Sequence, residues 1–301
     1  MDGTYASLDF KQKEAIGGTC ALGVASFVIS HGFNWRSVFW FGAGIAIIGA
    51  AARTRMRETK NFADARHRVK KAMATNNTDI KVLRNNPIWN ESFSRKTALS
   101  LFAIECAWPI CFYFAYIYCG SLLKHSFNFT PEQVIQQNFI VSLVQLANWL
   151  LLIVLSYKIY PLKILKVKLI IFMSMVIFLP MILNNATAAW QVLLVQSFIV
   201  AFGFMGAPAI SIFYKQIPIF KRFTYSTLIY ALSRFTHIIA AFGFAYFSTY
   251  LGHWGILVLI IPAAIAFTYA LRHFQEIDKV DFRDKFQSSP DILADPTLQS
   301  T

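Results

Sequence analysis

The sequence predicts an all-α membrane protein with eight transmembrane helices. Hydrophobic residues make up 56% of the 301-residue chain and the mean hydropathy is +0.49, whereas soluble domains are about 45–50% apolar. Eight apolar stretches each approach the roughly 20 residues that a helix needs to cross a bilayer core of about 30 Å. The Lys and Arg residues concentrate in every second gap between those stretches. These three observations favour a polytopic membrane protein over a soluble domain.

The apolar stretches follow one another along almost the whole chain. The candidate spans are, in order, Ala15–Gly32, Trp35–Arg53, Thr97–Gly120, Val134–Tyr157, Val167–Leu183, Trp190–Tyr214, Tyr225–Tyr250 and Trp254–Leu271. The first span resembles a secretory signal peptide because Lys11 and Lys13 precede it. Glu14 interrupts that basic flank, however, and no cleavage site of small residues follows before Trp35. We therefore expect a retained helix.

The positions of the basic residues predict the orientation of every span. All but three of the 28 Lys and Arg residues lie before Ala15, in the segments Arg53–Lys96, Lys158–Lys168 and Lys215–Arg222, or after Leu271; the exceptions are Arg36, Lys124 and Arg234. Basic loops stay on the cytoplasmic side of a membrane. The sequence therefore predicts a protein of the cell inner membrane with both termini in the cytoplasm. The net charge of +13 then reflects membrane topology and does not indicate nucleic-acid binding.

The spans divide the chain into four parts. Residues 1–53 form a pair of helices, 54–96 a basic cytoplasmic linker, 97–271 a group of six helices and 272–301 a cytoplasmic tail. Apolar residues recur at helical spacing within the linker, which fits a short helix along the membrane surface. A solvated linker that simply follows the charge bias is the alternative.

Two charged residues lie deep inside predicted spans. A charge near the centre of a membrane helix costs about 2.5–3.5 kcal/mol on insertion scales, so each such residue calls for a function or a partner. Glu105 and Arg234 each lie about eight residues into a span that enters from the cytoplasm, and at 1.5 Å per residue both are about 12–14 Å deep. Equal depth permits an ion pair between them.

Polar residues also share faces with these charges. His237 lies one turn after Arg234 on the same helical face. In the fourth span, amides and a hydroxyl recur every three or four residues at Asn138, Ser142, Gln145 and Asn148. Such faces are unfavourable against lipid. They predict either a polar translocation path, with Glu105 or His237 carrying a proton, or static hydrogen bonds between helices.

Other features narrow the class of function. The glycine- and proline-containing run Gly203–Pro208 should weaken its helix and permit bending. The four cysteines lie in or beside apolar spans without a Cys-x-x-Cys pair or a histidine cluster, so small apolar packing residues are a better interpretation than a metal or redox site. The sequence lacks a P-loop, an H-E-x-x-H and a G-x-S-x-G motif. We therefore do not expect an enzyme.

One stretch of the sequence resembles a known family. From Asn34 to Phe62 it reads NWRSVFWFGAGIAIIGAAARTRMRETKNF. This is similar to the fifth-to-sixth helix region of the metabolite:proton symporter group in the major facilitator superfamily, which includes proline/betaine transporters. The residues that carry the similarity are Trp35, Arg36, Arg55, Glu58, Thr59 and Phe62. Lys60 departs from the pattern, because the group has a proline there.

Of two predicted cytoplasmic loops, one supports the resemblance and the other departs from it. Pro218, Arg222 and Thr224 match a run that lies between the tenth and eleventh helices of the group, although Lys215 replaces its acidic residue. The resemblance implies a gating role for Pro218 and Arg222. The loop at Ser156–Pro161 lacks the aspartate and glycine that the group carries between helices eight and nine, which puts the usual cytoplasmic gating contact in doubt.

The resemblance covers almost the whole chain and implies that its eight spans correspond to helices 5–12 of a twelve-helix transporter. The first four helices would then be absent, and a second chain could supply them. The implied function is secondary active transport, namely proton-coupled uptake of a small polar metabolite or osmolyte such as proline or betaine. Neither a cofactor nor a metal is expected, and the coupling ion is a proton or sodium. The alternatives are a truncated relic that transports nothing and a membrane scaffold that binds cytoplasmic partners.

The topology makes a direct prediction. A reporter fused after Thr301 should lie in the cytoplasm, so a phosphatase fused there should be inactive and a fluorescent protein should fluoresce. The same phosphatase fused at Lys124, in an opposite gap, should be active. Recovery of the protein in the supernatant after ultracentrifugation without detergent would contradict the membrane assignment itself.

Overall fold

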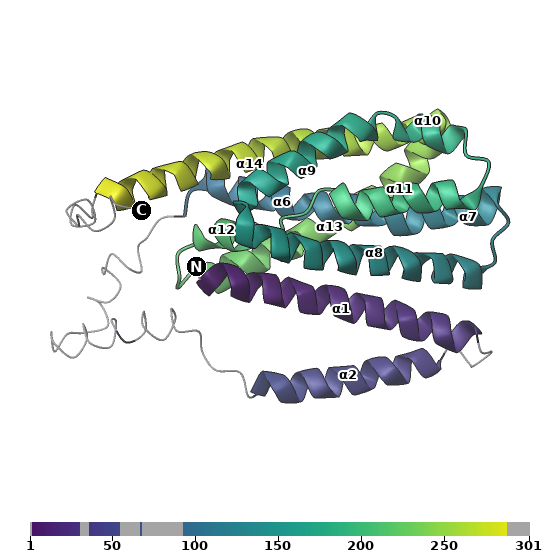
Figure 1. Ribbon diagram of the computed structural model, residues 1–301, viewed down its shortest axis with the longest axis horizontal. Coiled ribbons are helices and arrows are strands. Elements are labelled where there is room, and N and C mark those ends of the chain that lie inside the picture. The colour runs from purple at the N-terminus through teal and green to yellow at the C-terminus, as the bar shows by residue number, and fades with distance from the viewer. Residues whose placement is uncertain (1, 31–35, 55–66, 68–92, 288–301) are drawn as a thin grey trace.

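The computed structural model describes residues 2–30, 36–54, 67 and 93–287, and within these ranges all regular structure is helical (Figure 1). Most of the predicted basic linker, part of the resemblance region and the end of the tail lie outside the described residues. The elements are α1 (Asp2–Ser30), α2 (Ser37–Thr54), α6 (Arg95–Phe112), the π-helical turn η1 (Tyr113–Tyr118), α7 (Cys119–Ser126), α8 (Pro131–Lys158), α9 (Pro161–Val176), α10 (Leu179–Asn184), α11 (Ala189–Phe202), α12 (Ile210–Lys215), α13 (Arg222–Leu251), the 3-10 turn η2 (Gly252–Trp254) and α14 (Gly255–Gln287).

Helices occupy all eight predicted spans, but they differ in length. Three described helical stretches are long and apolar enough to cross a bilayer: Arg95–Ser126, Pro131–Lys158 and Arg222–Lys279. The last joins α13 to α14 through η2 and therefore covers two predicted spans. Shorter apolar helices lie at Ile16–Ser30, Phe39–Ala51 and Ala189–Phe202. The count of eight spans stays a prediction.

The helices run roughly side by side along the long axis of the molecule (Figure 1). α14 packs against α6 and α9, and α13 packs against both α6 and α14. On the other side, α1 lies along α8, and α2 contacts α1 at the edge of the bundle. Every residue of α2 from Phe39 to Ala51 is exposed. The protein thus has a well-packed part made by α6 to α14 and a peripheral apolar helix.

The centre of the packed part is rich in phenylalanine. Seven phenylalanine side chains there are almost inaccessible to solvent: Phe114, Phe172, Phe204, Phe213, Phe244, Phe267 and Phe274. Phe172 and Phe204 approach with ring centroids 4.6 Å apart, as do Phe213 and Phe274. Because lipid tails are as apolar as these rings, close packing of this kind stabilises a membrane bundle more than exclusion of water does.

Local sequence explains where α8 begins. Thr130 Oγ1 accepts a hydrogen bond from the Gln133 amide, and the Gln133 side chain accepts one from the Thr130 amide. This reciprocal capping box satisfies two N–H groups that the first turn of a helix cannot bond internally. Pro131 at the first helical position has no N–H to satisfy.

The loop between α8 and α9 is tied to the long last helix. The Tyr160 hydroxyl donates a hydrogen bond to the Asp278 carboxylate on α14. Partial burial and the nearby Asp278 charge raise the pKa of Tyr160 above its ordinary value, so the hydroxyl keeps its proton and remains a donor. The contact lies in the Ser156–Pro161 loop, which lacks the aspartate and glycine of the symporter group. It joins the connection between α8 and α9 to α14.

Lys168 lies at the border between the basic segment Lys158–Lys168 and the fifth predicted span, Val167–Leu183. The structure places it two turns into α9, where only 7% of the residue is exposed and Nζ has no hydrogen-bond partner. The reason is that α9 begins at Pro161 and already packs against the bundle by this point, with the Cys111 thiol of α6 near the ammonium.

The run Gly203–Pro208, predicted to weaken the helix of the sixth span, interrupts that helix completely. α11 ends at Phe202 and α12 begins at Ile210, with an irregular segment between them. A side chain at Gly203 would place its Cβ 2.3 Å from the Ile199 carbonyl oxygen, and a Cβ at Gly206 would lie 3.2 Å from Ile104 Cγ2 on α6. Glycine is therefore required at Gly203, because a backbone oxygen leaves no room there.

We expect Gly203→Ala to destabilise the protein by about 1–3 kcal/mol, as overpacking in a rigid core does. The purified protein in detergent should then show a melting temperature several degrees lower. Gly44→Ala on exposed α2, where a Cβ meets nothing within 4 Å, is the matched control and should not lower it. Equal melting temperatures for the two variants would contradict the steric argument.

Candidate functional site

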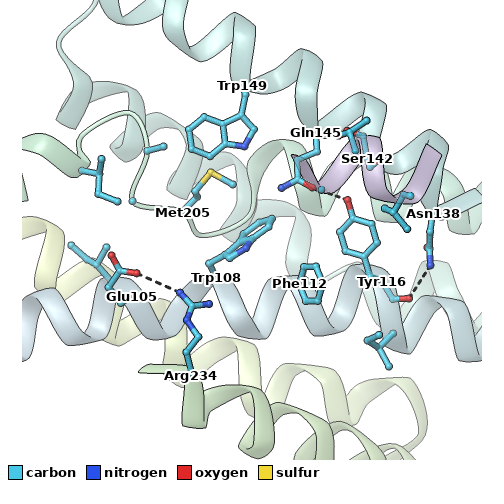
Figure 2. A pocket seen from close by; sticks show the side chains of 18 residues that line it. Glu105, Trp108, Phe112, Tyr116, Asn138, Ser142, Gln145, Trp149, Met205 and Arg234 are labelled. Atoms are coloured by element: carbon cyan, nitrogen blue, oxygen red, sulfur yellow. Dashed lines mark hydrogen bonds and ion pairs between the residues drawn. The ribbon is translucent and has the colours of Figure 1, made fainter. Parts of the chain in front are cut away.

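A cavity of about 490 Å³ lies between α1, α6, α8, α13 and the segment before α12 (Figure 2). Its aromatic wall consists of Trp108, Phe112, Tyr116 and Trp149. Its polar side chains include Thr19, Glu105, Asn138, Ser142, Gln145 and Arg234. Small-molecule sites in proteins typically measure about 300–1,000 Å³ and combine apolar walls with a few polar groups. The cavity has the size and lining of such a site.

Glu105 and Arg234 meet at one end of this cavity. Arg234 Nη2 is 3.8 Å from Glu105 Oε2, and the two side chains point toward one another in Figure 2. The carboxylate is nearly buried, with 8% of the side chain exposed, whereas the arginine side chain is 32% exposed. The distance exceeds that of a direct hydrogen bond, so the attraction between them is mainly that of two charges.

A second group holds the carboxylate. The Tyr214 hydroxyl, at the end of α12, donates a hydrogen bond of 3.0 Å to Glu105 Oε1. Glu105 therefore has a different partner on each oxygen, one neutral donor from α12 and one cation from α13. A buried carboxylate is stable only when such partners replace water.

Arg234 is itself oriented by its own helix. The guanidinium lies 4.0 Å from the centroid of the Tyr230 ring, a cation–π contact. Its Nη1 is 3.5 Å from His237 Nε2, while its buried Nε has no hydrogen-bond partner. His237 in turn packs edge-on against Phe112, with ring centroids 5.9 Å apart. The arginine thus keeps unused hydrogen-bonding capacity at the cavity.

The opposite end of the cavity is built from amides. Tyr116 donates its hydroxyl to Gln145 Oε1 at 2.7 Å, and Asn138 Nδ2 donates to the Tyr116 carbonyl at 3.4 Å (Figure 2). Behind them, Gln196 of α11 donates to Asn138 Oδ1 and to the Ala115 carbonyl. Gln137 donates to Gln196 Oε1 at 2.7 Å. This network connects α8, α11 and η1.

The π-helical turn supplies two acceptors of this network. Pro109 lies in the last part of α6, where its missing N–H removes one hydrogen bond of the helical ladder. Four residues later the chain widens into η1, and the carbonyls of Ala115 and Tyr116 accept side-chain amides from neighbouring helices. Single π turns of this kind are frequent at functional sites.

The structure brings only some of the predicted site residues to the cavity. Glu105, Arg234, Ser142 and Gln145 line it, whereas His237 and Asn148 are not among its lining residues. The Ser142 hydroxyl donates to the Phe139 carbonyl of its own helix, and the Thr19 hydroxyl donates to the Ser142 carbonyl. Asn148 Nδ2 is buried without a hydrogen-bond partner.

The two predicted gating residues lie together in the turn before α13. Pro218 is buried. Arg222, the first residue of α13, donates from Nε and Nη2 to the Ile217 carbonyl at 3.3 and 3.1 Å. The arginine thereby fixes the turn between α12 and α13. A gating role for either residue stays a prediction.

Sequence reasoning missed Tyr214 and Gln196. Gln196 is fully buried in the apolar helix α11, and an amide in the middle of an apolar span was the available signal. Tyr214 gave no comparable signal, because a tyrosine at the end of a span is common at a membrane interface.

Comparison with known families decides the class of the protein. The family model of the Major Facilitator Superfamily matches residues 14–241, well over half of the chain. The chain belongs to the major facilitator superfamily. Members of this family are membrane transporters and not enzymes, in keeping with the apolar helices described above. No curated protein and no solved structure matches the sequence.

The buried pair predicts an asymmetry between two substitutions. Arg234→Gln leaves an uncompensated buried carboxylate and should lower the melting temperature more than Glu105→Gln, which removes the buried charge. Breaking a fully buried pair costs about 3–5 kcal/mol; the cost here should be smaller, because Arg234 is 32% exposed.

The double variant Glu105→Gln/Arg234→Gln should be more stable than Arg234→Gln alone, since neither charge is then left unpaired. Thermal melts of the three purified variants in detergent measure this. If Arg234→Gln and the double variant melt at the same temperature, the two side chains do not interact.

Proposed function

We propose that this protein is a secondary active transporter polypeptide that takes up a small polar metabolite or osmolyte, such as proline or betaine, together with a proton. The single observation that supports this best is the nearly buried Glu105 carboxylate at the wall of the cavity, paired loosely with Arg234. An ionisable group inside a membrane bundle is a candidate for proton transfer.

The pair gives a physical route to coupling. Protonation neutralises Glu105 and releases Arg234 from its partner. The guanidinium can then bind the carboxylate of a substrate, for which arginine has a well-matched geometry. Because two carboxylates compete for one cation, proton binding and substrate binding favour each other. Thermodynamic linkage makes this effect reciprocal, and such couplings are typically about 1–3 kcal/mol.

The rest of the cavity fits a small zwitterion. The rings of Trp108, Phe112, Tyr116 and Trp149 line it beside the charge pair. Aromatic faces attract quaternary and secondary ammonium groups by cation–π interactions. A betaine or a proline has one such group and one carboxylate. Sodium is the alternative coupling ion, and replacing it by potassium in the assay separates the two.

We further propose that the protein lies in the inner membrane with both termini cytoplasmic, and that a second chain supplies further helices. Support for the partner comes from α2, whose residues from Phe39 to Ala51 are all exposed, and from the position of the cavity beside α1 rather than inside a closed bundle. The alternating-access mechanism also needs two moving halves around a central site.

Uptake into proteoliposomes tests the proposal. Labelled proline and betaine should accumulate when the lumen is alkaline, either with this chain alone or with a co-reconstituted chain that supplies further helices. Glu105→Gln should reduce uptake to background while the protein still inserts and folds. The matched control Glu132→Gln changes an exposed glutamate at the start of α8 and should transport at the wild-type rate.

Two outcomes would overturn the proposal. Wild-type uptake by Glu105→Gln would remove the proton-carrying role of this residue. Absence of uptake by the wild-type protein, with and without the partner, would favour the non-transporting relic. A scaffold role would instead predict cytoplasmic partners whose recovery is lost when the tail after Arg272 is deleted.

A further inference from the structure

The short helix α12 connects the cavity to the charge pair. Its first residue, Ile210, lines the cavity, as do Met205, Gly206 and Ala207 in the irregular segment before it. Its fifth residue, Tyr214, donates the hydrogen bond to Glu105. Ile210 and Tyr214 are four residues apart and therefore lie on the same face, one turn from each other.

The irregular segment is held close to the helix that carries Glu105. Gly206 lies against α6 so tightly that a Cβ there would be 3.2 Å from Ile104, the residue that precedes Glu105. At the other side of α12, Phe213 is fully buried and packs on Phe274 of α14 with ring centroids 4.6 Å apart. The ten residues from Met205 to Tyr214 therefore line the cavity, bond Glu105 and pack into the core of the bundle.

A ligand in the cavity would contact Ile210 at the start of α12 as well as Glu105, because both residues line it. Because α12 is only six residues long, a shift of Ile210 would also move Tyr214. Tyr214 is the one neutral donor that the described residues offer to the carboxylate.

We propose that Tyr214 is a positioning residue through which occupancy of the cavity controls the protonation of Glu105. The inference rests on the proposed function, since it assigns a regulator to the proton-carrying residue. A hydroxyl that donates to a carboxylate favours the charged form. Displacement of Tyr214 by a ligand would therefore help Glu105 hold its proton during transport.

The other titratable neighbours of Glu105 come from two elements. Arg234 and Tyr230 lie on α13, with His237 behind the arginine, and Cys106 follows Glu105 on α6 itself. The cavity-lining residues of α1 and α8 carry no titratable group. Arg234 is charged throughout the accessible pH range, so Tyr214 is the neighbour whose removal changes hydrogen bonding without changing charge.

The test is Tyr214→Phe, which deletes one oxygen. The infrared absorption of the protonated Glu105 carboxyl, assigned by its loss in Glu105→Gln, should titrate at a pH about one to two units higher than in the wild type, because the carboxylate loses a hydrogen bond that favours its charged form. Adding proline or betaine should raise the titration midpoint of the wild type more than that of Tyr214→Phe, in which only the competition for Arg234 remains. Tyr246→Phe, on the exposed face of α13, is the matched control and should behave as the wild type.

The infrared titration separates this inference from the proposed function, because it needs no transport. Wild-type midpoints in Tyr214→Phe, with and without ligand, overturn the inference even if uptake is normal. A shifted midpoint with no uptake by the wild type leaves the Tyr214–Glu105 link in place and removes the transport proposal. If Tyr214→Phe does not fold, Tyr214→Met also removes the donor and should show the same raised midpoint; a wild-type midpoint in that variant overturns the inference.

Discussion

The carboxylate of Glu105 is the constraint on which the site depends. A charge this far from water is tolerated only when other groups replace its hydration. α13 supplies a cation and α12 supplies a hydroxyl, so two separate elements must pack against α6 at the same depth. The interruption before α12 sets the depth of Tyr214. A continuous helix through residues 203–209 would place Tyr214 at a different depth from Glu105.

Irregular backbone in this protein lies where side chains can satisfy it. The π turn at Tyr113–Tyr118 exposes carbonyls that accept amides from Gln196 and Asn138. The segment after Phe202 begins with an ordinary helix-ending bond from the Gly203 amide to the Ile199 carbonyl. Within a bilayer, departures from helical geometry are confined to positions buried in protein or lining a cavity. Both departures here border the same cavity, which relates the folding constraint to the candidate site.

Much of this site could be anticipated from the sequence. Depth along a helix is a one-dimensional quantity, so the equal depth of Glu105 and Arg234 was visible without knowing which helices touch. The spacing of Ser142 and Gln145 likewise predicted a polar face. The sequence could not reveal lateral neighbours: Tyr214 reaches Glu105 from a separate short helix that begins after a break, and His237 contacts Arg234 and Phe112 and does not line the cavity. The burial of Lys168 could not be predicted for the same reason, since a basic residue near a predicted loop is indistinguishable in sequence from one that faces the bundle.

The length of α14 has a mechanical consequence. Its 33 residues extend for about 50 Å, roughly 20 Å more than the hydrocarbon core of a bilayer. The extension that carries Asp278 is attached to Tyr160, in the connection between α8 and α9. Tilting a straight helix of this length by about 10° around its far end displaces the near end by roughly 9 Å. Small rearrangements among the packed phenylalanines would therefore become large displacements at the end of α14 that carries Asp278, and the hydrogen bond from Tyr160 would transmit them to the connection between α8 and α9.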